Sequence, residues 1–358
     1  MKSLLAAENQ VGSSWQRSAD RLIGFSSHQY GFAHGLPSEP GHISREVPWQ
    51  AVLPADQTVA IHGPYQGDER RSCHRQSLSE ADDRGKSPLF YVVDLEPGLL
   101  PGHDLPMKIV SWNVNSLSVR LPHVLDYLAD TAPDVLALQE TKVPDDKFPV
   151  AEIEAAGYQV IYVGQKSYNG VALLARQPFA HVVSDLPGLD DPQRRLIAAT
   201  VDGVRIVNVY IPNGQEVGSD KYIYKLRWLQ SLYDFLQGEM AIYPRLVLLG
   251  DFNIAPTDLD VHDPVRWRDK ITCSAGERAW FDVLLGLGLI DSVRCLYPDQ
   301  PIYSWWDYRM SAFRRGWGIR IDHILVSREV RSVSAGVSLQ PRMLERPSDH
   351  APVWLQFE

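Results

Sequence analysis

The stretch Leu246-Val247-Leu248-Leu249-Gly250-Asp251-Phe252-Asn253 decides the fold, because a short apolar run delivers a carboxylate and an amide into one turn. Apolar runs of four to six residues bounded by turn signals are typical of buried strands. Other such runs end in the same way, at Asn113, at Glu140 and at Tyr210. Polar residues that follow several buried strands predict one crevice at the end of a sheet.

Two more polar groups follow late in the chain, in Arg320-Ile321-Asp322-His323 and Ser348-Asp349-His350. Each group alone has a simpler explanation. An Asp-Phe-Asn is often a turn or a helix N-cap, and a lone Glu or His is usually a solvated or structural residue. The recurrence favours a site. Acids and amides without a set of cysteine ligands suit a hard cation such as Mg2+ together with a phosphate.

The order of these motifs closely resembles the exonuclease III family of DNA-repair nucleases, within the endonuclease/exonuclease/phosphatase superfamily. The resemblance runs from about Met107 to the C-terminus. It rests on six ordered motifs: Trp112-Asn113, Gln139-Glu140-Thr141-Lys142, Asn208-Val209-Tyr210-Ile211-Pro212-Asn213-Gly214, Gly250-Asp251-Phe252-Asn253, Arg320-Ile321-Asp322-His323 and Ser348-Asp349-His350-Ala351-Pro352. It implies a DNase I-like α/β fold, a four-layer sandwich of two packed mixed β-sheets flanked by helices.

The residue pattern from 107 onward agrees with strands mixed with helices. Strands are expected at 108–113, 134–139, 158–163, 170–175, 196–201, 204–211, 245–250, 319–326, 331–339 and 351–357. Helices are expected at 119–130, 150–156, 220–237 and 278–286. The aromatic residues of 220–237 recur at helical spacing, which favours a core-facing stripe over a ligand stack.

Residues 1–106 differ from the remainder, because Gly and Pro interrupt them and no apolar periodicity is sustained. Such composition buries too little to offset chain entropy, so this segment is expected to be a disordered extension. Only 89–93 has the pattern of a strand. A regulatory arm and a misassigned start site are alternatives. Residues 107–358 are expected to form the catalytic domain.

The chain of 358 residues has a net charge of −9, which counts mildly against a nonspecific polyanion binder. Carboxylates that hold metal, with arginines clustered on one face, would reconcile this charge with DNA binding. Cys73, Cys273 and Cys295 lack a Cys-x-x-Cys spacing, so free thiols in a reducing compartment are expected. No run approaches a transmembrane helix or a secretory signal. A monomer located in the cytoplasm, without membrane contact, is expected.

Hydrolysis of a phosphodiester needs a metal, a group that activates water and a group that stabilises the leaving oxygen. Glu140 is the best metal ligand, and the family resemblance agrees. His350 suits a general base, and the resemblance implies that Asp322 orients it. Asp251 then acts on the nucleophile or the leaving group, and which of Asp251 and His350 activates water stays open. The resemblance implies Mg2+, with Mn2+ as a substitute, held by a set comprising Asn115, Glu140, Asp251, Asn253 and Asp349.

Four residues are expected to hydrogen-bond the scissile phosphate: Asn113, Tyr210, Asn213 and Asn253. The segment 303–317 places aromatics among cations, as on surfaces that stack on bases and hold phosphates. From it, Trp305, Arg309 and Trp317 are expected to contact DNA, although Trp305 equally fits a hydrophobic minicore. Lys221, Tyr222 and Lys225 resemble a second DNA-contacting stretch. Gly316-Trp317 departs from the Asn-Arg that relatives often carry, which bears on any abasic-site pocket.

The leading hypothesis is a Mg2+-dependent repair phosphodiesterase acting on double-stranded DNA, with 3′-to-5′ exonuclease activity, 3′-end cleaning and incision 5′ to abasic sites. One alternative keeps the fold but changes the substrate to RNA or a phosphorylated small molecule or lipid. Those branches usually carry a His-containing motif where this chain has Tyr210-Ile211-Pro212-Asn213-Gly214. A second alternative is an inactive DNA-binding relative, which the presence of all four catalytic residue types disfavours.

Overall fold

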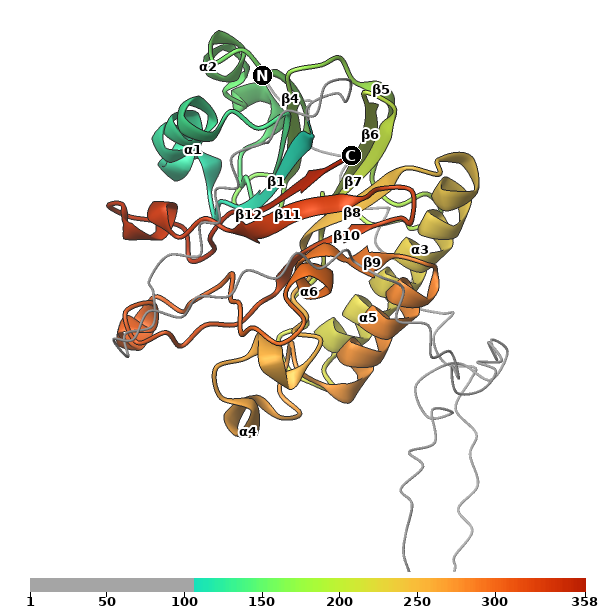
Figure 1. Cartoon of the computed structure of the whole chain (residues 1–358), viewed down its shortest axis with the longest axis vertical. Helices are drawn as coiled ribbons and strands as arrows, with labels where there is room; N and C mark the ends of the chain where they lie inside the picture. The colour runs from blue at the N-terminus through green and yellow to red at the C-terminus, as the bar shows by residue number, and fades with distance from the viewer. Residues whose placement is uncertain (1–105) are drawn as a thin grey trace, which may run out of the picture. The chain divides into compact units, whose positions relative to one another are not determined.

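The computed structural model describes residues 106–358. The extension predicted for 1–106 and the strand predicted at 89–93 therefore lie outside the described residues, apart from residue 106. Within the described part, the chain forms two six-stranded sheets that pack against each other (Figure 1).

The first sheet is mixed, and its N-terminal strand lies in the interior of the sheet. It comprises β11 (Ser332–Val337), β12 (Val353–Phe357), β1 (Met107–Asn113), β2 (Val135–Gln139), β4 (Val171–Ala175) and β3 (Gln159–Val163). The second sheet comprises β5 (Ala180–Ser184), β6 (Leu196–Val201), β7 (Val204–Tyr210), β8 (Leu246–Asp251), β10 (Asp322–Val326) and β9 (Ile290–Asp291). In each sheet one pair of central strands is parallel, β1 with β2 and β7 with β8.

Helices cover the outer faces of both sheets. The first sheet is covered by α1 (Leu117–Thr131) and α2 (Val150–Ala155), and the second by α3 (Asp220–Ile242) and α5 (Ala275–Gly286) (Figure 1). The shorter α4 (Pro264–Trp267) and α6 (Ser292–Leu296) lie in connections. Three apolar cores separate these four layers, one between the sheets and one under each pair of helices. This confirms the predicted four-layer α/β sandwich.

Strand β8 shows how local sequence sets the geometry. All six of its residues are buried, as expected for an apolar run with layers on both sides. Gly250 has a φ of 142°, and a Cβ there would lie 1.9 Å from the carbonyl oxygen of Val209 on β7. Only glycine therefore lets β8 lie this close to its neighbour just before it delivers Asp251.

Helices α3 and α5 begin at serine caps. The Ser219 hydroxyl accepts a hydrogen bond from the Tyr222 amide, and Ser274 forms a capping box with Glu277. On α3 the buried stripe includes Trp228, Leu229, Leu232 and Leu236, which confirms that its aromatic spacing marks a core face.

A buried polar bridge joins the two sheets near their site-bearing ends. Gln139 Nε2 on β2 donates to Asn208 Oδ1 on β7 at 2.8 Å, and Asn208 Nδ2 donates to the carbonyl oxygens of Leu138 and Ala172. Both side chains are fully buried. Because buried amides are costly unless hydrogen-bonded, this bridge fixes how the strand ends of one sheet face those of the other.

Several boundaries differ from the sequence predictions. The strand predicted at 319–326 begins at Asp322, because Ile319 instead forms isolated bridges with Val261 and Trp305. The helix predicted at 220–237 continues to Ile242. Strand β5 was not predicted, because its residues are mostly exposed and its pairing with β6 shifts register.

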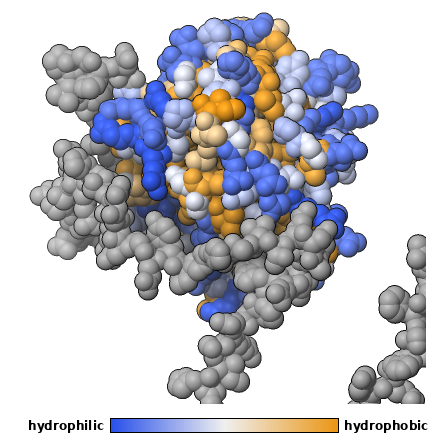
Figure 2. Space-filling model, turned by 90° about the vertical axis from the view of Figure 1, so that its right-hand side faces the viewer, coloured by the Kyte–Doolittle hydropathy of each residue, from blue (hydrophilic) through white to orange (hydrophobic). Residues whose placement is uncertain are grey.

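Two further predictions concern a cysteine and membrane crossing. Cys273 is a buried free thiol, as predicted for it. None of the helices in the described part of the chain combines the length and apolar character that a membrane crossing requires. The face drawn in Figure 2 alternates hydrophilic areas with narrower apolar strips.

Candidate active site

Strand register brings the predicted polar residues to one place. Asn113 pairs with Gln139 across the parallel strands β1 and β2, so Glu140 follows immediately beside it. Tyr210 pairs with Asp251 across β7 and β8, and Asp322 pairs with Asp251 across β8 and β10. Central strands of both sheets therefore end at the same crevice, as the sequence predicted.

Asn113 connects the two sheets within this crevice. Its Nδ2 donates to Glu140 Oε1 at 3.0 Å and to Asp251 Oδ2 at 2.8 Å. Its Oδ1 accepts from the Asn115 amide at 3.0 Å. Because both hydrogens of Nδ2 are in use, Asn113 contacts a phosphate only by exchanging one of these bonds. In this structure its amide aligns the two carboxylates.

His350 lies between two carboxylates. Its Nδ1 is 2.9 Å and 3.1 Å from the two oxygens of Asp322, and its Nε2 is 3.8 Å from Asp251 Oδ2. The Ser304 hydroxyl donates to Asp322 Oδ2 at 2.6 Å. The backbone amides of Ile321 and Asp322 donate to the same hydroxyl. Asp322 is thereby fixed, and it fixes the imidazole in turn. We call Asn113, Glu140, Asp251, Asp322 and His350 the strand-end cluster.

Burial and charge shift the acidities within the strand-end cluster. Burial raises the pKa of Asp251 to about 7, assisted by the negative charges of Asp322 and Glu140 and opposed by His350. Burial alone would lower the pKa of His350, but Asp322 and Asp251 together raise it to about 10. Burial also opposes ionisation of Glu140, yet the ammonium of Lys142 and hydrogen bonds hold its pKa below the usual value. The neighbouring carboxylates therefore favour the protonated form of His350 and oppose the loss of a proton from Asp251.

A second set of side chains lines the adjoining wall. Asn115 Nδ2 donates to Asp349 Oδ1 at 2.9 Å, and Trp305 Nε1 donates to Asp349 Oδ2 at 3.0 Å. Lys142 Nζ lies 2.5 Å from Asn115 Oδ1 and 2.8 Å from Glu140 Oε2. Lys142 therefore links the two sets, a role that nothing in its motif predicts.

Tyr210 ends β7, and Asn213 and Asn253 lie in the turns after β7 and β8. Burial raises the pKa of Tyr210 well above the usual value, and the nearby Glu140 and Asp251 charges raise it further. Asn213 Nδ2 donates to Asn253 Oδ1 at 3.0 Å, and the Asn253 amide donates to Asp251 Oδ1 at 2.9 Å. All three predicted residues thus adjoin the strand-end cluster.

The donor set suits a hard divalent cation. Among the described residues, Glu140, Asp251 and His350 each offer a ligand atom within 4.8 Å of the others. Carboxylate oxygens are the ligands that Mg2+ and Mn2+ prefer. Of the other residues predicted as ligands, Asn115 and Asp349 bond each other on the adjoining wall, and Asn253 is engaged by Asn213. The site therefore fits a divalent ion held by the Glu140 and Asp251 carboxylates with His350 beside them.

Residues 303–317, which we call the rim loop, flank the site. Arg309 is exposed and paired with Asp307, and Trp317 is half-buried between His262 and Arg315. Trp305 is half-buried, donates to Asp349 and packs against a small apolar cluster, as considered for it, while its DNA contact stays a prediction. The rim loop thus presents cations and aromatic edges beside the cluster.

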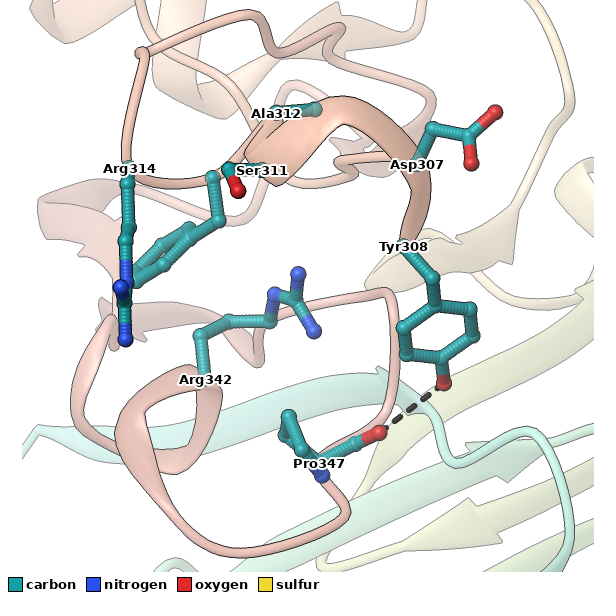
Figure 3. Close-up of a pocket in the computed structure, with 8 residues that line it drawn as sticks. Asp307, Tyr308, Ser311, Ala312, Arg314, Arg342 and Pro347 are labelled. Carbon is teal, nitrogen blue, oxygen red and sulfur yellow. Dashed lines mark hydrogen bonds between the residues drawn. The ribbon is translucent and has the colours of Figure 1, made fainter.

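A pocket of about 150 Å³ opens between the rim loop and the segment leading to Ser348 (Figure 3). Tyr308 closes one side, where its hydroxyl donates to the Pro347 carbonyl at 2.9 Å. The guanidinium of Arg342 points into the pocket, and Arg314 lines the opposite side (Figure 3). Two guanidinium groups make this pocket favourable for an anion such as a phosphate next to the site.

The expectation that Tyr222 and Lys225 contact DNA is wrong for this structure. Tyr222 is buried with its hydroxyl 2.8 Å from Ser274 Oγ, and Lys225 is fully buried against Glu277. Of Lys221, Tyr222 and Lys225, only Lys221 is exposed. Sequence reasoning also missed the roles of Ser304 and of the Gln139–Asn208 bridge. The bridge had a signal, because each amide interrupts an apolar run; Ser304 had none.

Known nucleases are similar to this chain over the residues that form the site. Residues 110–350 match the family model described as the Endonuclease/Exonuclease/phosphatase family. The chain is 38% identical over 268 residues to exodeoxyribonuclease III of Haemophilus influenzae, covering 70% of this chain and 100% of that protein. The chain belongs to the exonuclease III family. It is accordingly an enzyme of a family of hydrolytic nucleases.

Solved structures of exonuclease III relatives share the fold. A 3′ phosphatase from Neisseria, bound to a product DNA hairpin, is 52% identical with a TM-score of 0.70, covering 70% of this chain and 99% of that chain. An AP endonuclease from Archaeoglobus fulgidus is 37% identical with a TM-score of 0.68, covering 70% and 99% respectively. The 70% of this chain that aligns with these structures corresponds in length to the described residues 106–358.

Proposed function

We propose that this enzyme is a divalent-metal-dependent DNA-repair hydrolase that processes 3′ ends of double-stranded DNA. The observation that carries the proposal is the position of His350 between Asp322 and Asp251, beside Glu140. That arrangement combines a proton-exchanging imidazole with a divalent-cation site. The 52% identity to a protein described as a 3′ phosphatase, and to one described as a 3′-5′ exonuclease, supports 3′ ends as the substrate.

The chain's own residues divide the work. Asp322 holds His350 Nδ1, which leaves Nε2 directed towards Asp251 and able to exchange a proton with water or with the leaving oxygen. Asn113 keeps Glu140 and Asp251 aligned. Tyr210, Asn213 and Asn253 offer polar groups from the neighbouring turns to the phosphate. A bound Mg2+ or Mn2+ supplies positive charge that offsets the charge on the phosphoryl oxygens.

DNA is the substrate class because the rim loop offers cations and aromatics next to the cluster. Arg309 is exposed, Trp305 and Trp317 are half-buried, and Arg314 and Arg342 line the adjacent pocket (Figure 3). Lys221 is a further exposed cation, at the start of α3. Such surfaces bind the backbone and stack on bases. A monomer acting on duplex DNA, with no membrane partner, is the proposed form.

Incision 5′ to abasic sites is a second proposed activity. It is favoured by 37% identity to a protein described as an AP endonuclease. Gly316, at a φ of 68°, and the packed Trp317 replace the Asn-Arg often found there. Since this departure lies in the rim loop, we expect abasic incision to be slower than 3′-end processing.

A substrate panel tests the proposal. We would measure initial rates with Mg2+ on nicked duplexes ending in a 3′-phosphate or a 3′-hydroxyl, on a duplex carrying one abasic-site analogue, on duplex RNA and on an inositol phosphate. The proposal expects the DNA 3′ ends to be fastest and EDTA to stop the reaction. Faster hydrolysis of RNA or inositol phosphate, or undiminished activity in EDTA, would overturn it.

A further inference from the structure

Lys225 is a fully buried cation behind the active site. Its Nζ lies 2.5 Å from Glu277 Oε1, and both side chains have no exposed surface. A buried ion pair is costly to desolvate and is often no more stabilising than a well-packed apolar pair. Its presence at this position therefore calls for an explanation other than stability.

The remaining contacts of Lys225 supply one. Its Nζ donates to the carbonyl oxygen of Asn253 at 2.8 Å and to that of Asn213 at 3.2 Å. With Glu277, these bonds use all three hydrogens of the ammonium group. Lys225 thus joins the turn after β7 to the turn after β8 through their backbones.

These turns are the ones whose amide side chains meet. Asn213 Nδ2 donates to Asn253 Oδ1, and Asn253 Nδ2 donates to the Ile211 carbonyl, both at 3.0 Å. Asn253 has a φ of 51°, a left-handed conformation that asparagine tolerates better than most residues and that a contact to its backbone helps to fix. A fixed cation bonded to its carbonyl oxygen is such a contact.

Glu277 anchors the other end of the pair. Its Oε1 also accepts from the Thr272 amide, and its Oε2 accepts from the Ser274 amide and hydroxyl. Gly214 leaves room for the lysine stem, because a Cβ there would lie 3.2 Å from Lys225 Cδ. The ion pair therefore connects Glu277 on α5, through Lys225 on α3, to the backbones of both turns.

We propose that Lys225, held by Glu277, is a positioning residue that sets the amides of Asn213 and Asn253 for the phosphate of the substrate. This inference rests on the proposed function and names residues that act on the same site from behind. It predicts that loss of the ammonium slows catalysis through Asn213 and Asn253, without removing any group that touches DNA.

The first test compares Lys225→Met with Arg205→Met. Arg205 is an equally buried cation, ion-paired with Glu239 and bonded to the His181 carbonyl, but it contacts none of the site turns. Steady-state rates on a 3′-phosphorylated nick are measured below the melting temperature of each variant. We expect kcat of Lys225→Met to fall by about 10- to 100-fold with KM little changed, since small misplacements cost this much. Arg205→Met should keep its kcat despite a lowered Tm.

A double-mutant comparison separates positioning from general loosening. Lys225→Met is introduced into the Asn213→Ala, Asn253→Ala background. If Lys225 acts through these amides, it has little further effect on kcat there. An undiminished effect in that background would overturn the inference. Should Lys225→Met fail to fold, Glu277→Gln, which keeps an acceptor but loses the charge, is expected to lower kcat in the same background-dependent way.

The outcomes distinguish this inference from the proposed function. A wild-type enzyme that does not hydrolyse DNA refutes the proposed function. A wild-type enzyme that does, with Lys225→Met equal to it in kcat or no lower than Arg205→Met, refutes only the positioning role.

Discussion

The strand-end cluster and the rim loop adjoin one another but are built in opposite ways. In the cluster, Asp251, Asp322 and His350 are almost fully buried; Asp322 is hydrogen-bonded to His350, and Asp251 accepts from Asn113. On the rim loop, Arg309 and Tyr308 are exposed to solvent, with Arg309 paired with Asp307 and the Tyr308 hydroxyl bonded to the Pro347 carbonyl. Fixed, desolvated groups suit chemistry, because their orientation is set before substrate arrives. Exposed cations suit the capture of a long polyanion, whose backbone must be accepted in any sequence. Substitutions in the two regions should therefore change different quantities.

The largest effect is expected at His350. His350→Ala removes the proton-exchanging group, so the single-turnover rate on a 3′-phosphorylated nick should fall by about 10³- to 10⁴-fold. Adding Asp322→Ala should cost little more, because Asp322 acts through the imidazole. Losses that multiply in the double variant would show that the two residues act independently.

The next largest effect is expected at Glu140. Loss of an outer partner of a metal costs about 10- to 100-fold in affinity, and Glu140→Ala would remove a direct ligand of the proposed ion. The Mg2+ concentration for half-maximal activity should therefore rise by at least about 100-fold, with partial rescue by Mn2+. DNA affinity, measured by fluorescence anisotropy, should change much less. An unchanged metal requirement would place the ion elsewhere.

A smaller effect, on binding alone, is expected on the rim loop. Arg309→Ala should weaken DNA affinity a few-fold, reduce the slope of log affinity against log salt by about one, and leave kcat unchanged. Arg331→Ala is the matched control. Arg331 is also an exposed, ion-paired arginine, but it pairs with Glu358 at the end of β11 and β12 that lies away from the site. Equal effects of both variants would show that the rim loop holds no phosphate.

The smallest effect on catalysis is expected in a third region, the ion pairs that the buried Asp260 forms with Arg320 and Arg294. Burial alone would raise the pKa of Asp260, but Arg320 and Arg294 hold it well below its usual range. A depressed pKa stabilises the fold above the unfolded value of about 3.9 and loses that contribution as the pH falls below it. Asp260→Asn should therefore flatten the decline of unfolding free energy between about pH 5 and pH 2, by up to about 1.4 kcal/mol per pH unit. Chemical denaturation at each pH measures this; an unchanged slope would contradict it.

The contrast also explains what the sequence could predict. Apolar runs that end in Asn113, Glu140, Tyr210 and Asp251 identify strands whose ends meet, because parallel neighbours end at the same edge. Asn113, Glu140 and Asp251 of the cluster were therefore predictable from the pattern, whereas Asp322 and His350 were predicted from the late motifs and the family resemblance. The hydrogen bonds within the cluster were not predictable, because they depend on how far one sheet is set over the other, and the Gln139–Asn208 bridge fixes that.

On α3 the sequence contained a signal that the family resemblance obscured. Tyr222 and Lys225 share helical spacing with Leu229, Leu232 and Leu236, which places them on the buried stripe. Lys221 lies one position away and is exposed. Ionisable side chains on an apolar stripe are buried with a partner, and here the partner, Glu277, lies on another helix that pattern alone cannot place.

The most direct test of the division between chemistry and capture is Asp251→Asn, studied on a duplex with a 3′-phosphorylated nick in Mg2+. Asp251 belongs to the buried cluster and contacts Asn113 and His350, so its loss should remove catalysis and spare binding. Single-turnover rate and DNA affinity are measured on the same preparation. For Asp251→Asn we expect a single-turnover rate lowered by at least about 10³-fold, with a DNA affinity within a few-fold of wild type. A near-normal rate, or an affinity loss as large as the rate loss, would contradict it.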